Sequence, residues 1–344
     1  MSTQLVTTRR NITLKDVAEA AGVSPMSVSA VLNGGGRGTR YVSQEARARI
    51  LKAADDLGYQ RNELARAVAT GSSYVLGVVV CRPQSMTVSY MLMGALDEAQ
   101  QNGYAVKVLR YGSGSKEHFQ EMRRIMGQCV AWRVDGVIAL NAYEEDLRAI
   151  EFQQNLPFVL LDAHPDVGRD VSICADDEQG LRDVVQHLYD LGHRDMAFLS
   201  GGQGEGPHTI GATRVKIFEK TMASLGLDVP PHRIFYEVWS AYHAERGVHT
   251  LMDATQKKPT AILCAGDDPL AMVALRTLRQ RGLRVPQDVS VTGFGDLPMA
   301  QLADPPLTTV AQPFEEMGRR AVRELLLRMG KNTENALALE ERVQ

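Results

Sequence analysis

The chain contains no apolar run approaching the roughly 20 consecutive residues of a membrane-spanning helix, although 44% of its 344 residues are hydrophobic. Its first residues, MSTQLVTTRRN, also lack the apolar core of a signal peptide. We therefore expect a cytoplasmic protein with no membrane contact. The length is sufficient for a large core and more than one domain.

Cysteine is scarce, with four residues in the whole chain. Cys81, Cys129, Cys174 and Cys264 lie far apart and form no CxxC pair, and no histidine follows at the spacing of a zinc site. This pattern predicts neither a disulfide framework nor a metal site. We expect buried, unreactive thiols.

Motifs of common enzyme classes are missing as well. The sequence has no Walker A and no HExxH motif, and GGQGEG at 201–206 lacks the spacing of a dinucleotide-binding GxGxxG. SGSK at 113–116 fits SxxK without the partner motifs that would give it meaning. The sequence therefore predicts no catalytic site and no cofactor.

Charge is distributed unevenly along the chain. Residues 1–70 hold ten Lys or Arg against six Asp or Glu, whereas the remainder holds 28 against 35. The net charge of −3 and the pI of about 6.3 therefore average a basic N-terminal region with an acidic remainder. A basic region of this kind favours contact with nucleic-acid phosphates.

Residues 13–33, TLKDVAEAAGVSPMSVSAVLN, form the pattern of two short helices joined by a tight turn. Thr13 is a candidate N-cap, and Gly22 supplies the positive φ that often ends a helix. Ser24 and Pro25 then restart the chain as N-cap and first helical residue. This is the sequence form of a helix-turn-helix, although an ordinary alanine-rich helical pair gives a similar pattern.

The second of these helices has two distinct faces. Val28, Val31 and Leu32 fall at i, i+3 and i+4, so we expect them to face inward. The side chains left toward solvent or a partner are Met26, Ser27, Ser29, Ala30 and Asn33.

A third amphipathic helix is predicted over residues 42–59, with Ser43 as its cap and Gly58 near its end. The side chains expected to face inward are Ala46, Ile50, Leu51, Ala54 and Leu57. Three helices of this kind close a small core.

The ordered segments TLKDVAEAAGVS, VSAVLN, VSQEARARI and DDLGYQRNELARAVATG resemble the headpiece of the LacI/GalR (lactose-repressor) family of bacterial transcription regulators. The resemblance implies that the helix from Ser24 enters the DNA major groove and that residues 62–70 form a hinge helix in the minor groove. An isolated helix of that length is marginal in water, so it requires a dimer partner and DNA to be ordered.

The DNA-binding residues expected on this basis are Thr13, Ser24, Pro25, Met26, Ser27, Ser29, Ala30, Asn33, Arg37, Arg40, Asn62, Ala65, Arg66 and Val68. Ala30 stands where many relatives carry a guanine-binding arginine, so the half-site is expected to differ there. Val68 replaces the usual wedging leucine, which predicts a weaker or differently seated wedge between the base pairs. Arg37 and Arg40 fit either a phosphate clamp or a plain surface loop.

Beyond Gly71, short apolar runs alternate with helical patterns. The runs are 75–81, 105–109, 134–140, 158–161, 196–200, 261–264 and 289–293, and the helical patterns are 91–102, 180–191, 214–225, 243–252 and 269–281. This alternation predicts an α/β fold with parallel sheets and ligands at the carboxyl ends of the strands. The family resemblance likewise implies a body of two periplasmic-binding-protein-like subdomains.

The predicted organisation has three parts. A helix-turn-helix headpiece occupies residues 1–61, and a hinge helix and linker occupy residues 62–71. An effector-binding and dimerisation domain occupies residues 72–344, with chain crossings between its subdomains near Asp176 and Gln312. We prefer a dimer to a coiled-coil tetramer because no sustained heptads follow Arg328.

Arg214, in GATRVKIF, aligns with the arginine that relatives use to hold their effector, and its planar fork suits carboxylates or paired hydroxyls. Asp267 and Asp268 follow an apolar run and either accept hydrogen bonds from a ligand or cap the next helix. The other effector-binding candidates, each of which also fits a structural role, are Val88, Ser89, Tyr90, Asp176, His208, Tyr242 and Asp296.

These observations together predict a homodimeric DNA-binding regulator that is controlled by a small polar effector. We expect it to be a repressor that binds a palindromic operator. The alternative is a solute-binding protein or an α/β enzyme built on the same body. The basic headpiece and the missing export signal discriminate against the first, and the missing catalytic motifs against the second.

Overall fold

The computed structural model describes residues 12–32, 42–60, 67, 70–80, 85–111, 118–142, 150, 156–163, 172–201, 210–238 and 240–331. The chain divides into two compact units, residues 1–73 and 74–344, and the second is called the body below. Among the helices of the described segments, none has the length and apolarity to cross a bilayer.

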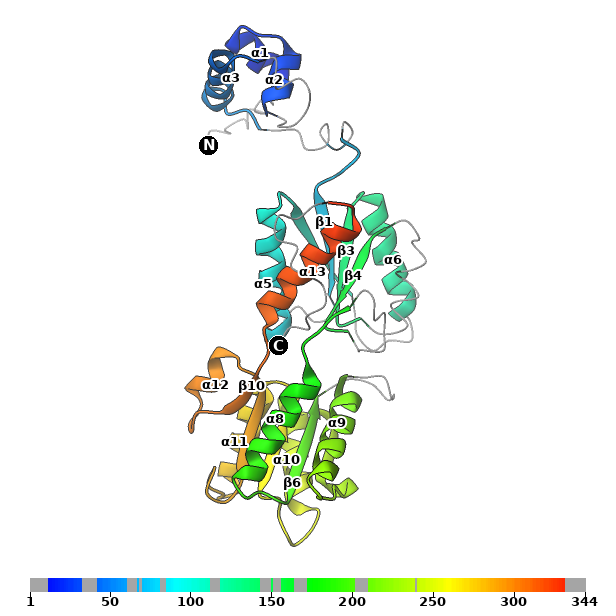
Figure 1. Cartoon of the computed structure of the whole chain (residues 1–344), viewed down its shortest axis with the longest axis vertical. Helices are drawn as coiled ribbons and strands as arrows, with labels where there is room; N and C mark the ends of the chain where they lie inside the picture. The colour runs from blue at the N-terminus through cyan, green and yellow to red at the C-terminus, as the bar shows by residue number, and fades with distance from the viewer. Residues whose placement is uncertain are drawn as a thin grey trace, which may run out of the picture. The chain divides into compact units, whose positions relative to one another are not determined.

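The headpiece consists of α1 (Leu14–Ala21), α2 (Pro25–Leu32) and α3 (Gln44–Asp56), which pack around one small core (Figure 1). The buried residues of that core are Val17, Ala18, Ala21, Val28, Val31, Ile50 and Ala53. Thr13 closes a capping box with Asp16, and Gly22 ends α1 in the left-handed region at φ 64°. Both predicted helix boundaries are therefore confirmed.

The inward face of α3 differs from the prediction. Ile50 and Ala53 are buried, whereas Leu51 is 49% and Leu57 is 37% exposed, so the prediction for both leucines was wrong. Since α1 and α2 have only eight residues each, they cover a narrow stripe of α3. Leu51, one step around the helix from Ile50, lies outside that stripe, and Leu57 follows the last residue of α3.

The first lobe of the body, the N-lobe, contains a five-stranded sheet of order β2-β1-β3-β4-β5. Its strands are β1 (Val75–Val80), β2 (Ala105–Arg110), β3 (Gly136–Leu140), β4 (Phe158–Leu161) and β5 (Ser172–Ile173). All neighbouring strands pair in parallel. The covering helices are α5 (Met86–Gln101), α6 (His118–Ala131) and α13 (Phe314–Arg328).

The second lobe, the C-lobe, contains a parallel sheet of order β10-β9-β8-β6-β7. Its strands are β6 (Met196–Gly201), β7 (Ile234–Val238), β8 (Ala261–Cys264), β9 (Ser290–Gly295) and β10 (Thr308–Ala311). Its helices are α8 (Asp177–Asp190), α9 (Ile210–Ser224), α10 (Ala241–Asp253), α11 (Asp268–Gln280), α12 (Pro298–Leu302) and the short 3₁₀ helix η3 (Pro231–Arg233). The predicted α/β architecture with two parallel sheets is thus confirmed.

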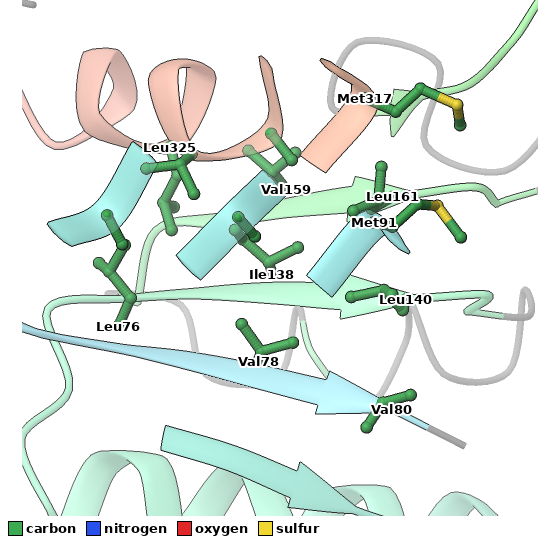
Figure 2. Close-up of a cluster of buried hydrophobic side chains, with 14 of the residues drawn as sticks. Leu76, Val78, Val80, Met91, Ile138, Leu140, Val159, Leu161, Met317 and Leu325 are labelled. Atoms are coloured by element: carbon green, nitrogen blue, oxygen red, sulfur yellow. The ribbon is translucent and has the colours of Figure 1, made fainter. Parts of the chain in front are cut away.

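The strands β1, β3 and β4 of the N-lobe sheet are buried on both faces, which explains their continuous apolar sequences, whereas the edge strand β2 is largely exposed. Figure 2 shows side chains of β1, β3 and β4, including Leu76, Ile138 and Val159, facing Met91 of α5 and Leu325 of α13. The opposite face of the sheet packs against α6. The central strands of the N-lobe sheet therefore lie between two apolar layers.

Among the described residues of the body, two chain segments connect the lobes. The first runs from β5 to α8 and contains Asp176, and the second runs from β10 to α13 and contains Gln312. Leu297, which follows β9, also packs into the N-lobe core although its strand belongs to the C-lobe. The C-terminal part of the chain thus returns to the first lobe through α13.

Several elements escaped sequence reasoning, namely α6, α12, α13, β5, β7 and β10. β5 has two residues, and β7 and β10 lie at the edges of the C-lobe sheet, where an apolar run is not required. Among the cysteines, Cys129 and Cys264 are buried. Burial raises the pKa of the Cys129 thiol to about 11, so this thiol is protonated and unreactive at neutral pH.

Candidate functional site

The second helix of the headpiece begins as the sequence predicted. The Ser24 hydroxyl accepts the Ser27 N–H at 3.2 Å, and Pro25 is the first residue of α2. The N-terminal turn of α2 is thereby closed by a side chain. This turn is the part of a recognition helix that meets base edges.

The face of α2 opposite its buried valines carries Met26, Ser29 and Ala30, which fall at i, i+3 and i+4. Met26 is 81% exposed, a high value for a large apolar side chain. Ser29 and Ala30 are partly buried and short. The structure therefore brings these three predicted DNA-binding residues onto one face of α2, close to the capped turn.

Seven predicted DNA-binding residues lie outside the described part of the chain: Asn33, Arg37, Arg40, Asn62, Ala65, Arg66 and Val68. In the predicted hinge, the described residues include Ala67 and Thr70. The Gly71 N–H donates to the Ala67 carbonyl at 2.9 Å, and the Thr70 hydroxyl donates to the Ser72 carbonyl at 3.2 Å.

In the body, Arg214 of α9 is only 6% exposed and is held by a carboxylate. Its Nε donates to Oδ2 of Asp177 at 2.7 Å, and its Nη2 donates to Oδ1 at 3.0 Å. Nη1 donates to the Ala265 carbonyl at 2.8 Å, and the guanidinium lies 4.4 Å above the centroid of the Phe294 ring. The fork predicted to grip an effector is thus bidentate to a protein side chain.

Asp162 of the N-lobe interacts electrostatically with Arg214. Asn141 follows β3 and Asp162 follows β4, and Asn141 Nδ2 donates to Oδ2 of Asp162 at 2.8 Å. Both have positive φ, 52° and 55° respectively. Such backbone conformations occur at functional sites more often than elsewhere. Sequence reasoning missed both residues, although each directly follows a predicted strand.

The charges at this site interact strongly. Burial by itself lowers the pKa of Arg214, but the neighbouring Asp177, Asp162 and Asp267 outweigh that effect and raise it. Burial raises the pKa of Asp162, and Arg214 offsets this only in part. One guanidinium therefore balances several carboxyl groups contributed by both lobes.

The two aspartates after β8 have different roles. Asp267, and not Asp268, caps α11, because its Oδ1 accepts the Leu270 N–H at 3.1 Å. Asp268 is fully buried and accepts the Leu297 N–H at 2.6 Å as well as the Thr309 hydroxyl. The expected cap role of Asp268 is therefore corrected: its carboxylate fixes the segment after β9.

The remaining effector candidates lie in varied surroundings. Val88 is 3% exposed within the N-lobe core, and Asp176 caps α8 by accepting the Gln179 N–H at 3.1 Å. Tyr242 is 68% exposed and packs edge-on against His243, with 5.3 Å between the ring centroids. Four further candidates complete the set: Ser89 and Asp296 are exposed, Tyr90 is partly buried, and His208 lies outside the described residues.

Two family models match this chain. One, described as bacterial regulatory proteins, lacI family, matches residues 13–62, and the other, described as a periplasmic binding protein-like domain, matches residues 185–343. Among curated relatives, the HTH-type transcriptional repressor PurR of Photobacterium profundum is 31% identical over 325 residues, 92% of each chain. The ribose operon repressor of Haemophilus influenzae is 27% identical and covers 94% of this chain and 93% of its own.

Solved structures of transcription regulators also superpose on this chain. A lac repressor dimer bound to operator and the anti-inducer ONPF superposes with a TM-score of 0.81 at 29% identity, over 94% of each chain. A complex of the transcriptional regulator CelR with cellobiose gives a TM-score of 0.67 at 27% identity, also over 94% of each chain. Both the helical headpiece and the two-lobed body therefore have counterparts in known structures.

Proposed function

This chain belongs to the lacI family of bacterial regulatory proteins, and we propose that the face of α2 described above reads operator bases while the Arg214 cluster binds the effector. The protein is a DNA-binding transcriptional repressor under allosteric control by a small molecule, and it is not an enzyme. Its partners are operator DNA, the effector and a second copy of the chain. We place it in the cytoplasm, where its DNA lies.

The DNA-reading role is supported by the exposed face of α2 and by the surplus of positive charge in residues 1–70. Phosphate contacts by arginines orient the headpiece, and the short side chains of α2 allow close approach to base edges. Because a dimer carries two headpieces, its operator is a palindrome whose half-sites match their spacing.

The effector-binding role is supported by the position of the Arg214 cluster. Parallel sheets bind ligands at the carboxyl ends of their strands, and Asn141, Asp162 and Asp267 all follow such ends. Since Asp162 belongs to the N-lobe and Arg214 to the C-lobe, a molecule bound by both contacts the two lobes at once.

A hydrogen-bonded path joins this cluster to the lobe connections. Asp177 follows the first connection directly, and its Oδ1 accepts from Nε2 of Gln312, in the second, at 3.0 Å. A ligand that changes the position of Arg214 therefore acts on both connections through one carboxylate. A coupling of about 1–3 kcal/mol would change operator affinity by roughly 5–150-fold.

The exposed recognition face of α2 is the observation that carries the DNA-binding proposal, and selection of bound sites from random duplex DNA tests it. We expect enrichment of a palindrome by the wild type and its loss in Met26→Glu, because a carboxylate on this face repels phosphates. Leu51→Glu adds the same charge to an exposed position of α3 and is the matched control.

The same selected duplex is then used to screen metabolites for a change in retention. Enrichment of no duplex by the wild type would contradict the proposal and favour a solute-binding protein. Equal loss of binding in both glutamate variants would remove α2 from its assigned role.

A further inference from the structure

Asp177 occupies the place that an anionic ligand would take on Arg214. Its two carboxylate oxygens accept from Nε and Nη2 in the parallel arrangement by which arginine binds a free carboxylate or phosphate. The third guanidinium nitrogen donates to the Ala265 carbonyl. The edge of the guanidinium formed by Nε and Nη2, which binds planar anions with two hydrogen bonds, is therefore occupied by a side chain of the protein.

This carboxylate is fixed in position by more than its arginine. Asp177 is the first residue of α8, its side chain is 21% exposed, and Gln312 donates a further hydrogen bond to Oδ1. Arg214 is equally constrained, with its side chain 8% exposed and stacked on Phe294. Displacing Asp177 by a ligand anion would break three hydrogen bonds and leave a partly buried charge without its partner.

The surrounding charge also opposes an anion. Asp162 and Asp267 interact with the same guanidinium, so one cation already faces three carboxyl groups. Burial raises the pKa of both aspartates, which means that the site disfavours further negative charge. Carboxylate oxygens accept hydrogen bonds from hydroxyl and N–H groups without such a cost.

We propose that Asp177 is a specificity-determining residue, which neutralises Arg214 so that the site takes a neutral, hydroxyl-rich molecule and rejects carboxylates and phosphates. This inference rests on the proposed effector site. The simplest expectation for an arginine in a ligand site is that it binds an acidic group, and this inference is the opposite. The neighbouring Asp162 and Asp267 then act as acceptors for the hydroxyl groups of the ligand.

The test uses inorganic phosphate and acetate as probes of the full-length protein, with the thermal unfolding midpoint followed at constant ionic strength. In Asp177→Asn the guanidinium loses the carboxylate that occupies its Nε and Nη2 edge, so we expect saturable stabilisation by either anion with an affinity at least tenfold above that of the wild type. Glu178→Gln is the matched control, because it removes an exposed charge from the next residue of α8 without touching Arg214.

A wild type stabilised by phosphate or acetate as strongly as Asp177→Asn, with the effect lost in Arg214→Met, would overturn the proposal. Absence of any gain in Asp177→Asn would overturn it as well. If Asp177→Asn does not fold, Asp177→Ser is measured in its place, since a hydroxyl oxygen still accepts one guanidinium N–H.

A second measurement needs no variant. Neutral sugars and their uronic acids and phosphate esters are compared in pairs as modulators of wild-type operator binding, and we expect responses to neutral members only. A response to an acidic member alone would overturn the assignment of Asp177 while leaving the repressor function intact. Failure of the wild-type protein to bind any operator would instead contradict the proposed function, whatever the result of the anion experiment.

Discussion

Ala30 leaves the exposed face of α2 without a long hydrogen-bonding side chain. A methyl group offers a base pair only van der Waals contact, whereas an arginine binds guanine O6 and N7 with two hydrogen bonds. Met26 and Ser29 share this face, and neither offers the two parallel N–H donors of an arginine. We therefore propose that the identity of residue 30 decides whether one base pair of the half-site is read strongly.

We predict that Ala30→Arg gains a guanine preference at the facing base pair, worth about 1–3 kcal/mol of discrimination. Base-by-base selection with the variant and the wild type measures this change. Ala30→Leu is the control, since it adds length without donors. If the arginine and leucine variants select the same base, bidentate recognition is absent and the placement of residue 30 is wrong.

Asn141 and Asp162 are a second residue-scale feature. Each has a positive φ and continues a buried strand of the N-lobe, and together they form one hydrogen-bonded pair. Conformations of this kind cost free energy for residues other than glycine and persist where surrounding structure imposes them. We infer that the strand ends hold Asn141 and Asp162 in this conformation, where the Asp162 carboxyl interacts electrostatically with Arg214.

At the scale of elements, α5 and α13 cross at very short range. A Cβ atom on Gly94 would lie 1.9 Å from the Glu315 carbonyl oxygen, and one on Gly318 equally close to the Met91 carbonyl oxygen. Two glycines thus allow the helix backbones to touch. Because α13 is the last described helix of the chain, this crossing attaches the C-terminal segment to the N-lobe.

We predict that Gly94→Ala lowers the free energy of unfolding of the body by about 1–3 kcal/mol, because the new methyl group meets backbone that cannot rotate away. Urea unfolding, followed through hydrogen exchange of the α5 and α13 amides, measures the loss. Gly127→Ala in α6 is the control, because a Cβ there meets nothing within 4 Å. Alanine at that helical site is expected to stabilise by roughly 0.5–1 kcal/mol; a loss equal to that of Gly94→Ala would contradict the packing argument.

At the scale of the whole molecule, positive and negative charges are concentrated in different parts of the chain. The N-terminal 70 residues carry a surplus of four positive charges, and the remainder carries a surplus of seven negative charges. The basic part attracts DNA phosphates, while the acidic part avoids non-specific binding along the duplex. A modest total charge therefore does not argue against a DNA-binding protein.

We predict a steep fall of operator affinity with salt, with a slope of log K against log salt of about −7 if each surplus charge of both headpieces neutralises one phosphate. Arg47→Gln, on the exposed side of α3, should make the slope shallower by about 2 per dimer. Arg182→Gln, on the exposed side of α8 in the body, should leave it unchanged. Binding titrations from low to moderate salt measure all three, and identical slopes would exclude Arg47 from phosphate contact.

The sequence by itself determined the features that depend on neighbours within about four residues. Thr13, Gly22 and Ser24 mark helix boundaries through local hydrogen bonds and backbone conformation, so their roles could be predicted without the fold. The buried strands β4 and β8 were likewise predicted in full, because both faces of a parallel sheet are covered and the apolar runs are continuous.

Only the tertiary structure decided which distant groups meet. Asp177 and Arg214 are 37 positions apart, and their pairing depends on how α8 and α9 pack on one sheet. The exposure of Leu51 depends on the length of the helices that cover α3, and the burial of Asp268 depends on the path of the chain after β9. Periodicity specifies which face of an element is apolar. The partner of each polar group is set by long-range packing, because the free energy of a buried polar group depends on both its burial and the partner it finds.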